Sequence, residues 1–172
     1  MRKTSDVPLH YNAVDILERN LEERADKIAL YSPERAMTFR EVSNEVNQVG
    51  RALLKLGLRF GDIVGILSVD CPEWAASFFG IVKIGGVAIG MNTMLTTREC
   101  DYILRDSRAR ALIVHESLLP SIEQVREGLP FLEHVIVIGR PARPGDLPYR
   151  NWIGDRPVEL EAAPTTAMTT AC

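Results

Sequence analysis

Apolar residues recur along the chain at two spacings, one typical of helices and one typical of buried strands. The clearest helical stripe begins at Val42 and continues to Leu53 at intervals of three or four residues. Thr38 and Glu41 precede it at the spacing of a capping box, in which hydroxyl and carboxylate each bond the other residue's backbone N–H. The pattern predicts a helix over 38–56. Its expected buried residues are Val42, Val46, Val49 and Leu53, and its expected exposed residues are Arg40, Glu45, Gln48 and Lys55.

Four short runs of mostly apolar and β-branched residues follow this helix, and each has the length of a strand buried on both faces. They cover residues 63–69, 87–91, 111–114 and 135–138. The stretches between them predict helices over residues 72–84, 96–104 and 120–129. Because strand–helix–strand connections of this length enforce parallel pairing, we expect an α/β fold with a mostly parallel sheet covered by helices on both faces.

The N-terminal part of the chain shows two further elements. Residues 11–22 carry Val14, Leu17 and Leu21 at helical spacing, which predicts one amphipathic helix. The apolar runs 28–31 and 36–39 are separated by Ser-Pro-Glu-Arg, which predicts a β-hairpin with a four-residue loop at the side of the sheet.

Three regions follow from this pattern. Residues 1–10 form an N-terminal tail, residues 11–139 an α/β subdomain, and residues 140–172 a linker rich in proline, alanine and threonine. No charged residue follows Glu161, so we expect the end of the linker to need a partner, either further chain or solvent.

Composition narrows the class of protein. Hydrophobic residues make up 46% of the chain and charged residues 25%, which is typical of a globular domain. The net charge is -3 with basic and acidic residues interspersed, so nucleic acid is not an expected partner. The widely spaced Cys71, Cys100 and Cys172 suit reduced thiols and a cytoplasmic location. No stretch has the ~20 consecutive apolar residues of a membrane span.

Glycines are the first candidates for binding chemistry. Gly80, Gly85, Gly86 and Gly90 lie close together, but they do not form a G-x-G-x-x-G run between a strand and a helix, and no P-loop motif is present. We therefore interpret these glycines as a helix stop and as sites of close packing.

Other candidate side chains are isolated. His10, His115 and His134 have no cysteine or carboxylate at a metal-ligand spacing. Cys71 stands at a predicted helix N-terminus, which can lower a thiol pKa, but without a basic neighbour a small packed cysteine is the better interpretation. Asp106 and Arg108 fit a structural turn. We assign no catalytic, cofactor-binding or metal-ligating residue.

Several ordered segments resemble one enzyme family. Met-Thr-Phe-Arg-Glu-Val at 37–42, Leu-Leu-Lys-Leu-Gly at 53–57 and Gly-Asp-Ile-Val-Gly-Ile-Leu at 61–67 match its opening pattern. Cys-Pro-Glu-Trp at 71–74 and Asn-Thr-Met-Leu-Thr at 92–96 continue the match. Over residues 11–138 the chain resembles the adenylate-forming (AMP-binding) acyl-CoA synthetases, most of all their benzoate-CoA ligase branch. It departs from many relatives at Ala88 and Gly90, where prolines are common.

The resemblance implies the first subdomain of the family's large N-terminal domain. It also implies a parent protein that adenylates a carboxylic acid with ATP and magnesium and then forms a thioester with coenzyme A. The family's phosphate loop has no counterpart here and is expected shortly beyond Cys172. We therefore expect residues 1–172 alone to be inactive and to partner the remainder of a ligase chain.

An alternative from another class stays open. The chain could instead be a free-standing, non-catalytic binding module or pseudo-enzyme derived from the family. An aromatic acid is the expected substrate of the parent, and whether the chain dimerises also stays open.

Overall fold

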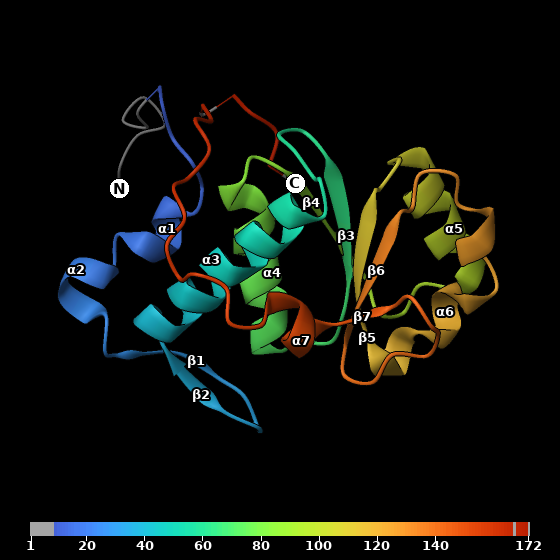
Figure 1. Ribbon diagram of the computed structural model, residues 1–172, viewed down its shortest axis with the longest axis horizontal. Coiled ribbons are helices and arrows are strands. Elements are labelled where there is room, and N and C mark those ends of the chain that lie inside the picture. Colours follow the sequence, from blue (N-terminus) through green and yellow to red (C-terminus); the bar gives the residue numbers. More distant parts are fainter. Residues whose placement is uncertain (1–8, 167, 172) are drawn as a thin grey trace.

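The computed structural model describes residues 9–166 and 168–171 (Figure 1). The strands are β1 (Ile28–Tyr31), β2 (Ala36–Thr38), β3 (Ile63–Leu67), β4 (Val87–Met91), β5 (Ala111–His115), β6 (His134–Ile138) and β7 (Leu147–Pro148). The α-helices are α1 (Asp15–Glu18), α2 (Leu21–Arg24), α3 (Phe39–Lys55), α4 (Pro72–Lys83), α5 (Thr97–Asp106), α6 (Pro120–Glu123) and α7 (Tyr149–Ile153). Short 3-10 helices cover Glu116–Leu118 and Arg126–Gly128.

Five strands form one parallel sheet in the order β4-β3-β5-β6-β7. The predicted α/β fold and the parallel pairing of the four apolar runs are confirmed. The first of these strands ends at Leu67, two residues earlier than expected, and Val69 is 40% exposed. The hairpin β1-β2 is a separate antiparallel sheet, as predicted.

Helices cover both faces of the sheet (Figure 1). Successive residues of β5 point to opposite sides, so Ile113 packs into a cluster with α3, α4 and α7, while Leu112 packs into a cluster with α5 and α6. Both side chains are fully buried. This two-sided burial explains why the strands are apolar at nearly every position.

The helix α3 has the predicted N-terminus and the predicted buried face. Thr38 Oγ1 accepts a hydrogen bond from the Glu41 N–H at 3.2 Å, and Glu41 Oε2 accepts one from the Thr38 N–H at 2.7 Å. Thr96 and Glu99 form the same capping box before α5. The four apolar side chains of the α3 stripe are at most 2% exposed.

The predicted helix over 11–22 is wrong in its continuity, because two short helices take its place. Asn20 Nδ2 donates to the Ile16 carbonyl at 2.9 Å and to the Leu17 carbonyl at 3.1 Å, and so ends α1. A second helix, α2, then begins at Leu21, which is only half-buried.

The predicted helix over 120–129 is also divided. The α-helical part stops at Glu123, whose carbonyl accepts a hydrogen bond from Arg143 Nη2 at 2.9 Å. A side chain from a distant segment thus takes an acceptor that a continuing helix would use, and a 3-10 turn follows at Arg126–Gly128.

Residues 140–172 contribute two elements that the sequence analysis did not predict. β7 adds a fifth strand at the edge of the sheet. Pro148 has no backbone N–H, and it is tolerated here because no further strand lies on the outer side of β7 to accept a hydrogen bond. α7 buries Tyr149, Trp152 and Ile153. Residues 154–166 then run in extended form across α3 toward the N-terminal segment, and we call them the strap (Figure 1).

Candidate functional site

Two of the candidate glycines, Gly80 and Gly85, have the structural roles expected of them. A Cβ at Gly80 would lie 2.7 Å from Val49 Cγ1, so this glycine allows α4 to pack closely on α3. Gly85 ends α4 with a φ of 76°, a conformation that favours glycine. Gly90 lies exposed on β4.

The candidate histidines are not brought together. His115 and His134 lie at opposite ends of the neighbouring strands β5 and β6, and His10 forms a bridge with Thr166. Within residues 9–166 and 168–171, no group of three His, Cys, Asp or Glu side chains could hold a metal ion. In the same described chain, no helix is long and apolar enough to cross a membrane.

Cys71 occupies the N-cap of α4 and is half-buried. Burial raises the pKa of its thiol, and the Ser68 hydroxyl lies 3.5 Å from its sulfur. A protonated thiol is a poor nucleophile, so the geometry supports the packed cysteine rather than a reactive one.

Arg108 lies in the turn after α5 with a φ of 56°.

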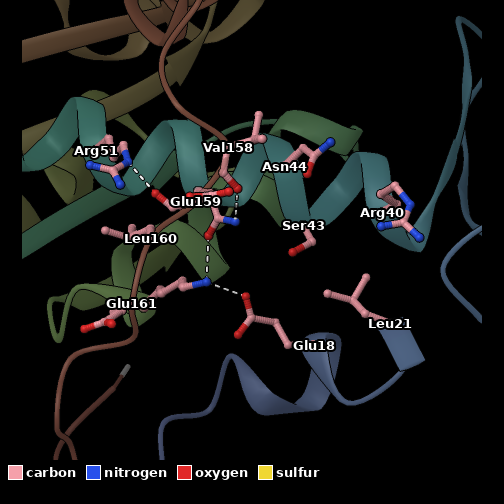
Figure 2. Close-up of a pocket in the computed structure, with 12 residues that line it drawn as sticks. Glu18, Leu21, Arg40, Ser43, Asn44, Arg51, Val158, Glu159, Leu160 and Glu161 are labelled. Atoms are coloured by element: carbon pink, nitrogen blue, oxygen red, sulfur yellow. Dashed lines mark hydrogen bonds and ion pairs between the residues drawn. The ribbon is translucent and has the colours of Figure 1, made fainter. Parts of the chain in front are cut away.

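A polar groove lies between α1, α2, α3 and the strap, with a volume of about 790 Å³ (Figure 2). Its lining combines cationic, anionic and amide side chains from segments far apart in the sequence. Ser43, Asn44 and Arg51 reach it from α3, Glu18 from α1, and Glu159 from the strap.

A buried lysine forms the floor of this groove. Lys83, in the last turn of α4, is 3% exposed, and its ammonium donates to Glu18 Oε1 and, at 2.6 Å, to Asn47 Oδ1. A buried charge is tolerated only when it is paired and hydrogen-bonded, and here both conditions hold. Lys83 is therefore committed to internal contacts and is not free to act as a nucleophile. The sequence gives no signal for this pairing, because Glu18 and Asn47 are far from Lys83 along the chain.

A second charged cluster surrounds Glu45 of α3, and it corrects a prediction. Glu45, expected to be exposed, is 5% exposed, and Gln48, also expected to be exposed, is half-buried. The Glu45 carboxylate accepts hydrogen bonds from Arg35 of the hairpin, and from Tyr149 and Arg150 of α7. Both arginines also reach Glu73 of α4. Polar residues from three distant segments thus convert an outward position into a buried one.

Tyr149 belongs to the same cluster. Its hydroxyl donates to Glu45 Oε1 at 3.1 Å, and the side chain is 1% exposed. Burial first, and then the negative charge of Glu45, raise the pKa of Tyr149 well above its ordinary value. The phenol therefore stays protonated and acts as a hydrogen-bond donor that joins α7 to α3.

The carboxyl edge of the sheet offers another site. The chain leaves β3 toward β4 on one side and later returns to β5 on the other, and ligands of open α/β sheets bind at such a switch of direction. Beside it, a groove of about 380 Å³ lies at the carboxyl ends of β3 and β4. Asp70, Trp74 and Asn92 line it, which provides a carboxylate, an aromatic ring and an amide.

Comparisons with known proteins identify the source of this architecture. The model of the family described as AMP-binding enzyme matches residues 17–169. A 4-hydroxybenzoate–CoA/benzoate–CoA ligase of Rhodopseudomonas palustris is 34% identical over 136 residues, which are 78% of this chain and 25% of the ligase. A benzoate–CoA ligase of Thauera aromatica is 34% identical over 162 residues, which are 92% of this chain and 30% of the ligase.

Solved structures agree with these relatives. The crystal structure of the anthranilate CoA ligase AuaEII in complex with anthranoyl-AMP matches with a TM-score of 0.93 and 57% identity, over 98% of this chain and 32% of that one. A benzoate CoA ligase from Burkholderia xenovorans LB400 matches with a TM-score of 0.81 and 26% identity, over 90% of this chain and 30% of that one. The chain thus spans about a third or less of the relatives described here. Since the family model covers most of its length, the chain belongs to the AMP-binding enzyme family.

Proposed function

We propose that the chain is the N-terminal portion of an ATP-dependent aryl-CoA ligase in the cytoplasm. Such an enzyme joins a carboxylic acid to AMP with release of pyrophosphate, and then transfers the acyl group to the thiol of coenzyme A. The observation that carries the proposal is the 57% identity to an anthranilate CoA ligase over 98% of the chain. The remainder of the ligase chain is the partner that this proposal requires.

An aromatic acid is the proposed substrate of the whole protein. The relatives that support it are named for benzoate, 4-hydroxybenzoate and anthranilate, which share a carboxylate on a benzene ring. Anthranilate is the first acid to test, because the ligase named for it has the higher identity among the two structures compared above.

Residues 1–172 alone are proposed to be inactive. Adenylation requires the polyphosphate and the carboxylate to be held in line by backbone N–H groups and cations, and these positioned charges supply most of the rate. In the described part of the chain, the most deeply buried cation, Lys83, is already paired with Glu18.

Pyrophosphate release tests the proposal. We expect residues 1–172 to stay at background with ATP and benzoate, anthranilate, 4-hydroxybenzoate or a fatty acid. The whole protein, containing the sequence encoded after Cys172, should turn over the aromatic acids roughly tenfold or more faster than the fatty acid.

Each result has a definite meaning. Turnover by residues 1–172 would refute the inactive-portion proposal, and a preference for the fatty acid would refute the aromatic substrate. A stop codon directly after Cys172, together with no activity, would instead support the non-catalytic binding module.

A further inference from the structure

The strap contains no helix or strand, so its carbonyl groups need partners from other segments. Three side chains of α3 donate to these main-chain carbonyls: Asn47 to Val158 at 2.6 Å, Gln48 to Gly154 at 3.1 Å and Arg156 at 3.3 Å, and Arg51 to Glu159. Figure 2 shows the strap passing beside Arg51 of α3. Because the acceptors are main-chain carbonyls, these bonds fix the course of the strap and do not depend on its side chains.

A glycine of α3 provides the apolar part of the contact. A Cβ at Gly50 would lie 2.4 Å from Leu160 Cδ2 and 3.2 Å from Ile84 Cγ2. Gly50 lies inside a 17-residue helix, where glycine is less favourable than alanine. The missing side chain leaves a notch that the Leu160 side chain of the strap fills.

The far end of the strap is tied to α4 and to the N-terminal segment. The Ala163 N–H donates to the Lys83 carbonyl at 2.7 Å, and Asn12 Nδ2 donates to the Ala163 carbonyl at 3.3 Å. The Tyr11 N–H then donates to the Thr165 carbonyl at 3.0 Å. The strap is therefore held at both ends and in the middle.

We propose that Asn47 and Gly50 are positioning residues, which fix the strap on α3 and thereby the place where the chain beyond Thr166 meets the edge strand β4. At that edge the Ala88 N–H donates to the Ala171 carbonyl at 2.9 Å. The contacts described above support the docking of the strap on α3. Its consequence for catalysis rests on the proposed function, because the phosphate loop is expected to follow this segment.

Hydrogen exchange of residues 1–172 tests the role of Asn47. In Asn47→Asp the remaining oxygen still accepts from Lys83, but the donor to the Val158 carbonyl is lost and a negative charge faces that carbonyl. We expect exchange at the Ala163 and Ala88 amides to accelerate roughly fivefold to tenfold, the range for one lost hydrogen bond. Asn44→Asp is the control, because it makes the same side-chain change at another residue of the groove. It should leave the exchange rates of these two amides unchanged.

A double-mutant cycle tests the notch. Gly50→Ala and Leu160→Ala should each accelerate exchange at Ala163, while amides of β5 keep their protection. In the Leu160→Ala background, Gly50→Ala should have little further effect, because the leucine that the new methyl group would meet is gone. Additive effects, unchanged strap amides in both Asn47→Asp and Gly50→Ala, or equal acceleration across the whole sheet would overturn the proposal.

Activity measurements separate docking from function. In an active whole ligase, Asn47→Asp should lower the rate of pyrophosphate release, and faster strap exchange with an unchanged rate would overturn the positioning role. A wild-type protein without activity would refute the proposed function, and the exchange experiments would still decide whether Asn47 and Gly50 hold the strap.

Discussion

Individual residues of α3 show where sequence periodicity succeeds and where it fails. Val49 is buried as its place in the stripe predicts, because its neighbours on α3 are apolar too. Glu45 has an outward position by the same pattern, yet it is buried among Arg35, Tyr149 and Arg150. Nothing within one helical turn of Glu45 indicates these partners, so a local pattern could not predict its burial.

Glu45→Ala should lower the free energy of unfolding by about 3 kcal/mol, because it leaves the buried Tyr149 hydroxyl without an acceptor and two arginines with one carboxylate fewer. Urea denaturation measures the change. Lys55→Ala, at an exposed position of the same helix, should change the stability by less than about 0.5 kcal/mol. Equal losses from both substitutions would contradict the buried network.

At the scale of elements, α3 and α5 were predictable because their signals are local. Thr38 and Glu41, like Thr96 and Glu99, are three residues apart, and both capping boxes form as the spacing indicates. β7 and α7 were not predictable in this way. β7 has only two residues, one of them Pro148, and it exists because β6 lies beside it.

The contact between α3 and α4 depends on a glycine, and this gives a second stability prediction. Gly80→Ala would place its Cβ 2.7 Å from Val49 Cγ1 and 3.0 Å from the Val46 carbonyl. Overpacking of this kind should cost about 2 kcal/mol. Gly128→Ala is the matched control, since its Cβ would meet nothing closer than 3.7 Å, and it should be neutral or slightly stabilising. Thermal unfolding of both variants distinguishes close packing from a general glycine effect.

The whole molecule follows from the order of its strands and helices more than from any one element. The lengths of the connections predicted the parallel sheet, and the apolar strands predicted its burial on both faces. The groove around Lys83 was not predictable, because it forms where α1, α3, α4 and the strap meet. Its walls come from residues as far apart in the sequence as Glu18 and Glu161.

The two capping boxes begin α3 and α5, which cover opposite faces of the sheet, and they also predict how the molecule responds to acid. Hydrogen bonds from the Thr38 N–H and hydroxyl hold the pKa of Glu41 below 4.5, and those of Thr96 do the same for Glu99. Because these pKa values are lower in the folded state, the stabilisation is complete above the unfolded value of 4.5 and is lost as the pH falls through the lower folded values.

Melting temperatures measured from pH 7 down to pH 3 test this response. We expect the melting temperature to decrease once the pH is lower than about 4.5. This decrease should be smaller in the double variant Glu41→Gln/Glu99→Gln, which cannot titrate at these positions. Identical acid limbs in the variant and the wild type would show that the two caps do not contribute.

The strap contacts join residues that are very distant along the chain, and this sets the order in which the molecule can be completed. Asn47 and Val158 are 111 residues apart, while Thr165 bonds to Tyr11 across 154 residues. During synthesis the N-terminal segment leaves the ribosome before its partners at residues 163–165 are made. Tyr11 and Asn12 can thus be fixed by these contacts only after residues 163–165 have been translated.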